Sequence, residues 1–173
     1  MMMNRKIILS GTNVALAAMT EADQPVFQQW LATNAELREQ IDDPRIPSME
    51  DQIRWFRRVQ EPDRKFFSLV TVPDGVLIGN CGFVDIDVKK KEAILRITIG
   101  NANFLGKGLG SEAVSLLVRY GFEIMDLRRI LLNVLSSNVR AIRSYQKTGF
   151  VTSKDLQGRN AMLTMSISNP AYS

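Results

Sequence analysis

The sequence has no histidine and only one cysteine among its 173 residues. A chain without imidazole has no Ser-His-Asp triad, no histidine metal ligand and no histidine general base. A single thiol, Cys81, allows neither an internal disulfide nor a cysteine zinc site. We therefore expect no bound metal, a reducing cytoplasmic compartment, and an acid or base that is Asp, Glu, Tyr, Lys, Cys or water.

Long apolar runs, repeats and low-complexity linkers are also missing. The apolar stretch after Arg5 and Lys6 ends after three residues at the polar segment 10–13, so it does not fit a secretory signal. No run of 18 apolar residues occurs, and we expect no membrane span. A formal charge of +4 is too small to indicate a nucleic-acid partner. The length predicts one domain, residues 1–173.

The first half of the chain carries the periodicities of strands and helices in turn. We expect strands at 7–9 and 14–16, a helix that begins near Thr20 or Asp23, a second helix after the capping-box segment 48–51, and a β-hairpin of 66–72 with 76–86. The turn of the hairpin is Pro73-Asp74-Gly75, whose residue types favour a tight reversal. This half therefore predicts both element types.

The second half alternates between the same two periods. We expect a strand at 93–99, a helix from Ser111, a strand at 128–135, a short helix from Asn138 that Gly149 closes, and strands at 150–151 and 161–167. The whole order predicts a mixed α/β protein.

Three alternating glycines, Gly106, Gly108 and Gly110, lead directly into the helix expected from Ser111. Such a loop leaves backbone N–H groups open at the positive end of a helix, where a phosphate binds well. The Walker A spacing is absent, and Ser111 stands where a dinucleotide-binding loop has its third glycine. The loop predicts a pyrophosphate ligand. A bare glycine turn and a nucleotide-phosphate-binding domain are the alternatives.

Two segments together resemble a known family. Residues 106–113, GKGLGSEA, and residues 138–150, NVRAIRSYQKTGF, resemble the GNAT superfamily of acetyl-CoA-dependent N-acetyltransferases. The segments 20–23 and 78–82 are similar to its branch of ribosomal-protein alanine N-acetyltransferases. The resemblance covers about residues 12–152.

The resemblance implies a fold and a reaction. The fold would be a single-domain GNAT-like α/β (α+β) fold, with a mixed, mostly antiparallel central sheet splayed in the middle and helices on both faces. The reaction would move the acetyl group of acetyl-CoA directly to a primary amine in a ternary complex. The acceptor would be a small molecule such as an amino sugar, or a protein N-terminus. Homodimers are common in this branch.

The resemblance also assigns roles to individual residues. Tyr145 matches the tyrosine that acts as general acid for the leaving thiolate. The coenzyme-binding positions would be Ile97, Thr98, Ile99, Leu105, Gly106, Lys107, Gly108, Leu109, Gly110, Ser111, Asn138, Ala141 and Tyr145. On local grounds alone, Tyr145 is a half-buried core residue and Asn138 is an N-cap.

Two positions depart from the family pattern. Leu105 stands where the loop usually has Arg or Gln, which removes one side-chain donor to the phosphates. Ile94 stands where many relatives have a glutamate that serves as base for the amine. Glu92, two residues earlier on the same face, is the tentative base; Asp85, Asp87 or a water chain are the other candidates. These departures keep open a degenerate acyl-CoA-binding or regulatory module without turnover.

A basic patch lies on and just after the second helix, at Arg54, Arg57, Arg58, Arg64 and Lys65. One interpretation is a solvated helix face. The other is a wall of the acceptor groove, which would favour an acidic acceptor, such as an amino-sugar nucleotide or an acidic protein's N-terminus, over a polyamine.

Overall fold

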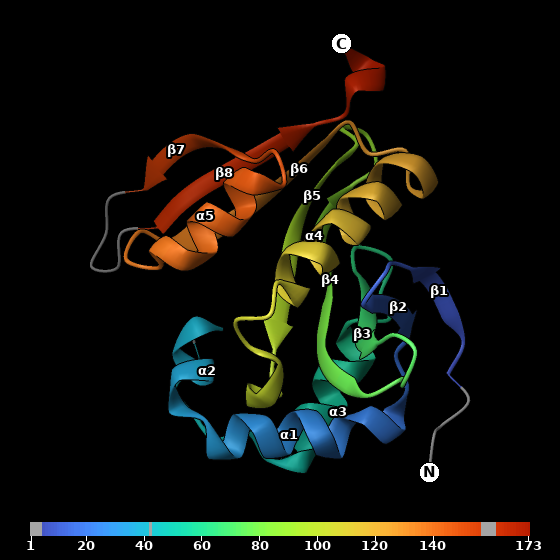
Figure 1. The fold of residues 1–173 in the computed structure, drawn as a ribbon, viewed down its shortest axis with the longest axis vertical. Helices are drawn as coiled ribbons and strands as arrows, with labels where there is room; N and C mark the ends of the chain where they lie inside the picture. The colour runs from blue at the N-terminus through green and yellow to red at the C-terminus, as the bar shows by residue number, and fades with distance from the viewer. Residues whose placement is uncertain (1–4, 42, 157–161) are drawn as a thin grey trace.

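An eight-stranded sheet runs through the molecule in the order β1-β2-β3-β4-β5-β6-β8-β7 (Figure 1). The computed structural model describes residues 5–41, 43–156 and 162–173. The strands are β1 (Ile7–Ser10), β2 (Val14–Ala18), β3 (Lys65–Thr71), β4 (Leu77–Asp87), β5 (Glu92–Ile99), β6 (Arg129–Leu135), β7 (Val151–Leu156) and β8 (Met162–Ser168). The helices are α1 (Gln24–Thr33), α2 (Ala35–Gln40), α3 (Met49–Arg58), α4 (Leu109–Arg119) and α5 (Val139–Lys147).

The centre of the sheet separates between β5 and β6. Every other pair of neighbouring strands is antiparallel, whereas β5 and β6 are parallel. Their ladder joins Glu92–Ile94 to Arg129–Leu131 and ends there, so the remaining parts of both strands diverge. This confirms the expected mixed, mostly antiparallel sheet that is splayed in the middle.

Helices cover both faces of the sheet, as two neighbouring residues of β3 show. Successive side chains of a strand point to opposite faces. The ring of Phe67 meets Tyr120, at the end of α4, with centroids 4.8 Å apart. The ring of Phe66 meets Trp55 of α3 at 5.5 Å. The two helices therefore lie on opposite sides, which confirms the expected fold class.

The main hydrophobic core lies between the sheet and α4. Its buried side chains come from β2 to β6, from β8 and from α4. Cys81 is fully buried within it, and burial raises the pKa of its thiol far above the usual range. The thiolate form of Cys81 is therefore disfavoured, and the residue serves packing.

Most of the expected elements are confirmed, with one addition. The expectation of two helices in the first third was incomplete, because α2 follows α1 directly. Its six residues bury Leu37 alone, so no apolar repeat marked it; Asn34 caps it by accepting a hydrogen bond from Leu37 N at 3.1 Å. Of the last expected strand, Ala161 lies outside the described residues. Within the described ranges, no helix has both the length and the apolarity that crossing a membrane requires.

Candidate active site

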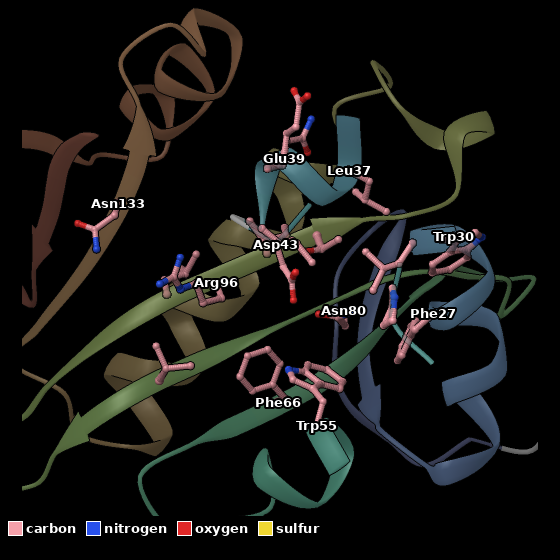
Figure 2. A pocket seen from close by; sticks show the side chains of 18 of the residues that line it. Phe27, Trp30, Leu37, Glu39, Asp43, Trp55, Phe66, Asn80, Arg96 and Asn133 are labelled. Atoms are coloured by element: carbon pink, nitrogen blue, oxygen red, sulfur yellow. The ribbon is translucent and has the colours of Figure 1, made fainter. Parts of the chain in front are cut away.

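A cleft of about 1090 Å³ occupies the place where β5 and β6 diverge. Its walls include Ile97 and Thr98 of β5, residues 132–135 of β6 and Tyr145 of α5. It continues between the sheet and α1–α3 (Figure 2). Because the ladder ends at Ile94, the edge of β5 from residue 95 onward is free of β6 and borders this space. An extended ligand can pair with such an edge.

The glycine loop ends at the N-terminus of α4. Gly106 and Gly108 have φ values of +74° and +77°, a region that side chains other than glycine rarely adopt, and Gly108 is the N-cap of the helix. A Cβ atom on Gly108 or Gly110 would meet no heavy atom within 4 Å. The backbone of this turn is therefore open to a bound anion, as the loop pattern predicted.

Two positively charged side chains lie at the glycine loop, although residue 105, where the family usually has Arg or Gln, is an exposed leucine. Nη2 of Arg140, on α5, lies 3.7 Å from the position that a Cβ on Gly106 would take. The Lys107 ammonium lies over the Phe104 ring, 5.3 Å from its centroid. Arg140 therefore offers a guanidinium beside the loop from the second motif rather than from the first.

Hydrogen bonds join α4 to α5 and to the β1–β2 turn of the sheet. Ser111 Oγ of α4 lies 2.5 Å from Ser144 Oγ of α5. The Glu112 carboxylate accepts hydrogen bonds from Asn13 N at 2.8 Å, Asn13 Nδ2 at 2.9 Å and Val14 N at 3.3 Å. Partial burial works against the charged form, but these bonds outweigh it and hold the pKa of Glu112 below its ordinary value. The first turn of α4 is thus fixed to the β1–β2 turn.

Asn138 and Ala141 also line the cleft. Asn138 Oδ1 accepts a hydrogen bond from Ala141 N at 3.1 Å, which confirms the N-cap interpretation. A contact of either residue with a coenzyme stays a prediction.

Tyr145 is half-buried and lines the cleft from the inner side of α5. Its ring packs at 6.1 Å from the ring of Phe150. Burial raises the pKa of Tyr145 above its ordinary value of 10, and the positive charge of Arg96 partly opposes the rise. The phenol therefore stays protonated at neutral pH, as a proton donor must. Its hydroxyl has no hydrogen-bond partner among the described residues.

The structure does not bring the tentative base to the cleft. Glu92 pairs in register with Arg129 where the two parallel strands still form a ladder, and its carboxylate lies 3.0 Å from Nη2 of Arg129. This ion pair holds Glu92 at the closed end of the splay, outside the lining residues. Asp87 instead accepts backbone hydrogen bonds in the β4–β5 turn, and Asp85 is exposed outside the cleft. The lining residues of β4 and β5 include no carboxylate.

Four aromatic rings form one wall of the cleft, which we call the aromatic wall: Phe27, Trp30, Trp55 and Phe66. Their neighbouring centroids lie 5.7 Å (Phe27–Trp30), 6.3 Å (Phe27–Trp55) and 5.5 Å (Trp55–Phe66) apart. A Cβ on Gly100 would collide with the Trp30 ring, so this glycine lets the indole lie against the chain just past β5. Phe27 is buried behind the other rings, and the partly exposed rings of Trp30, Trp55 and Phe66 offer the apolar contact surface of the wall.

Charged side chains make up much of the remaining lining: Arg45, Arg54, Arg58, Arg64, Arg96, Glu39, Asp43 and Asp51. Ion pairs occupy three of the arginines: Arg45 with Asp43 at 2.8 Å, Arg54 with Glu50 at 3.3 Å, and Arg58 with Asp63 at 2.8 Å. The hydrogen bond from Arg45 lowers the pKa of Asp43. The expected basic patch thus reaches the cleft at Arg54, Arg58 and Arg64, but two of these three charges are balanced by carboxylates.

Sequence reasoning did not single out Arg96, and it interpreted Trp30, Trp55 and the phenylalanines as core residues, whereas the structure places these rings along the cleft. Arg96 alternates with Leu95 and Ile97 along β5, a pattern typical of a strand with one solvated face. Only the packing of α1 and α3 near that face turns it into a cleft wall. Among the residues that the structure describes, no group of three or more His, Cys, Asp or Glu side chains could hold a metal ion.

Comparisons with known proteins agree with this geometry. A family model described as "Acetyltransferase (GNAT) domain" matches residues 13–151. The uncharacterized N-acetyltransferase p20 of Bacillus licheniformis is 37% identical over 90 residues, which cover 49% of this chain and 50% of the relative. Spermidine N(1)-acetyltransferase of Escherichia coli K12 is 32% identical over 96 residues, with 56% and 50% covered. The matches therefore span about half the length of these curated relatives.

A solved structure is similar over nearly the whole chain. It is a spermidine N-acetyltransferase from Vibrio cholerae in complex with CoA and spermine, with a TM-score of 0.82 at 21% identity. The match covers 92% of this chain and 97% of that one. At this identity the likeness shows the shared fold.

Proposed function

The chain belongs to the GNAT acetyltransferase family, and we propose that it moves the acetyl group of acetyl-CoA directly to a primary amine. The observation that carries the proposal is the position of Tyr145 in the cleft between the diverging strands, with its phenol protonated and without a hydrogen-bond partner among the described residues. A direct transfer needs no histidine and no cysteine nucleophile. The chain has no histidine, and its one cysteine, Cys81, is buried in the core, so both observations agree with direct transfer.

The coenzyme fits the residues that are present. The open turn at Gly106–Gly110 would hold its pyrophosphate through backbone N–H groups, and Arg140 would add the charge that Leu105 lacks. The free edge of β5 at Ile97–Ile99 would pair with the pantetheine arm. Bound in this way, acetyl-CoA supplies an activated acyl group at the splay.

The remaining steps are bond formation to the amine, protonation of the leaving sulfur and loss of the amine proton. The amine nitrogen forms a bond to the acetyl carbon while the carbon–sulfur bond breaks, and the Tyr145 hydroxyl donates its proton to the leaving sulfur. The proton of the amine leaves through water, because the cleft is open and the lining residues of β4 and β5 hold no carboxylate. Holding both reactants in one cleft supplies much of the rate, since well-oriented reactions gain roughly 7–11 kcal/mol.

For the acceptor, we infer a small amine. The polyamine substrate in the names of the relatives from Escherichia coli and Vibrio cholerae makes a small amine a better candidate than a protein N-terminus. For the same reason we do not retain the assignment to the ribosomal-protein branch. An acceptor that carries a negative charge agrees with the cleft better than a polyamine does, because Arg64 and Arg96 line it without ion-pair partners among the described residues.

The test replaces Tyr145 with Phe, which keeps the ring and its contact with Phe150 but removes the proton donor. Thiol release from acetyl-CoA, measured in the presence of an amine, should fall by roughly 10²- to 10⁴-fold in kcat, while acetyl-CoA binding stays unchanged. Tyr172→Phe is the control, because Tyr172 lies outside the cleft lining, in a cluster with Lys91 and Asp126. Full activity of Tyr145→Phe would rule out the general acid.

A further inference from the structure

The cleft contains two arginines that form no ion pair with an acidic residue of the described chain. Among the described residues, neither Arg64 nor Arg96 has an ion-pair partner, whereas the other three lining arginines do. Nε of Arg64 is also buried without a hydrogen bond. On the acidic side, Glu39 of α2 is the lining carboxylate that has no hydrogen-bond or ion-pair partner among the described residues, and it is exposed. The uncompensated charge of the cleft is therefore positive.

Arg96 stands close to the reacting centre. It precedes Ile97 and Thr98, the residues of β5 at the splay, and its charge acts on the phenol of Tyr145. In Figure 2, Arg96 lies on β5 between Asn133 of the diverging strand β6 and the rest of the cavity. An anionic group bound to this guanidinium would lie within a few bonds of an amine that reacts beside Tyr145.

The aromatic wall lies along the same cavity, on the side of α1 and α3. Figure 2 shows Trp55 and Phe66 near one end of it and Phe27 and Trp30 near the other. Leu31 and Leu37 also line this region. An aliphatic or aromatic group is the natural occupant, because burying it against these rings removes apolar surface from water.

We propose that the acceptor is an apolar or aromatic α-amino acid, whose carboxylate binds Arg96 and whose side chain packs against the aromatic wall. The inference rests on the proposed function and specifies its acceptor. An α-amino acid is the class that places an amine and a carboxylate on one carbon, with an apolar group on the same atom. Arginine is suited to the task because its planar fork matches a carboxylate with two hydrogen bonds.

Acetyl transfer to an amino acid follows the same steps as transfer to any primary amine. The α-amino nitrogen forms a bond to the acetyl carbon, the carbon–sulfur bond breaks, and the sulfur takes the proton of Tyr145. The amine proton passes to water, from which Tyr145 is reprotonated. The products are an N-acetyl amino acid and free coenzyme A.

A polyamine fits the same cleft poorly. Each of its ammonium groups needs a carboxylate or an uncompensated negative field, whereas Asp43 and Asp51 already hold arginines, which leaves Glu39 alone among the lining carboxylates. Arg96 would repel an ammonium group beside the reacting amine. This separates the chain from what the names of its spermidine-acetylating relatives suggest.

The experiment compares ligands that differ in one group. Phenylalanine, phenethylamine, alanine and spermidine are titrated calorimetrically into the protein saturated with coenzyme A, and the same four are assayed for thiol release from acetyl-CoA. Phenethylamine lacks only the carboxylate, and alanine lacks only the ring. The variants are Arg96→Gln and, as a matched control, Arg57→Gln, an exposed arginine of α3 outside the cleft lining.

We expect phenylalanine to bind at least tenfold more tightly than phenethylamine, alanine and spermidine. Arg96→Gln should remove the preference over phenethylamine, a loss of roughly 10- to 100-fold for one bidentate charge pair, and Arg57→Gln should leave it unchanged. Equal binding of phenylalanine and phenethylamine to the unaltered protein, or a preference that survives in Arg96→Gln, would overturn the proposal.

The binding and thiol-release measurements distinguish a failure of this proposal from a failure of the proposed acetyltransferase function. Binding of phenylalanine that depends on Arg96, without thiol release, would contradict the transferase and support the ligand class. Thiol release with spermidine that is insensitive to Arg96→Gln would support the transferase and overturn the ligand class. A loss of kcat in Arg96→Gln that is equal for phenylalanine and phenethylamine would also overturn the ligand class. Arg96 would then act on the transition state and not on the carboxylate of the substrate.

Discussion

Replacement of Glu112 by Gln tests how the glycine-loop helix is held in place. The carboxylate accepts three hydrogen bonds from Asn13 and Val14, at 2.8, 2.9 and 3.3 Å, across 98 or more residues of sequence. A glutamine keeps one oxygen as acceptor but removes the charge and turns an N–H₂ group toward a donor. Hydrogen bonds to a charged group contribute about 1.5–3 kcal/mol each and are not additive. We expect a loss of about 2 kcal/mol of unfolding free energy.

The assay is thermal unfolding at several pH values. For a domain of this length, about 2 kcal/mol corresponds to a melting temperature about 4–8 °C lower at pH 7. The folded state holds the pKa of Glu112 below its ordinary value of 4.5. Its contribution is therefore complete above that value and is lost as the pH falls through the lowered pKa. The melting temperatures of the two proteins should converge in acid.

The control is Glu123→Gln, which removes the same charge from an exposed residue after α4 that has no hydrogen-bond or ion-pair partner in the described part of the chain. It should change the melting temperature by less than about 1 °C, since such surface changes have small effects. A Glu112→Gln variant as stable as this control at pH 7, or one whose deficit is undiminished in acid, would refute the argument that the ionised carboxylate fastens α4.

Two further predictions concern the same loop. Gly108→Ala should lower the unfolding free energy by about 1–2 kcal/mol, because alanine at a φ of +77° is strained, whereas Gly110→Ala, without a positive φ and with open space around it, should be close to neutral in denaturant unfolding; equal losses in both would contradict the backbone argument. Arg140→Gln should raise the KM for acetyl-CoA by roughly tenfold with little change in kcat, because its guanidinium lies beside Gly106; an unchanged KM would mean that the loop backbone and Lys107 alone hold the phosphates.

The sequence predicted the parts of the site that depend on local geometry. A glycine at each positive-φ position of a loop that enters a helix is a local requirement, so Gly106 and Gly108 were recognisable from their spacing. The N-cap at Asn138 is similarly local, since its side chain serves a backbone N–H three residues away. The periodicities of 2 and 3.6 residues located most of the strands and helices for the same reason.

Glu92 shows where such reasoning fails. It lies on the expected strand and on the expected face, but the register of β5 against β6 places it opposite Arg129, and the ion pair forms there. Register between strands 37 residues apart depends on packing of the whole sheet, which no local pattern encodes. The same holds for the guanidinium of Arg140, which lies beside Gly106 only because α5 packs next to the loop.

The sequence by itself determined the family and the absence of imidazole chemistry, and it predicted the anion-binding turn and the candidate proton donor, because each depends on residue types at fixed short spacing. The tertiary structure decided which charges face the acceptor. One of the two interpretations of the basic patch made the groove basic at Arg54 and Arg58, yet carboxylates balance both, while Arg96 has no ion-pair partner among the described residues and its charge acts on Tyr145. Ion pairing and burial depend on which side chains meet across the fold, and only the packed chain fixes those distances.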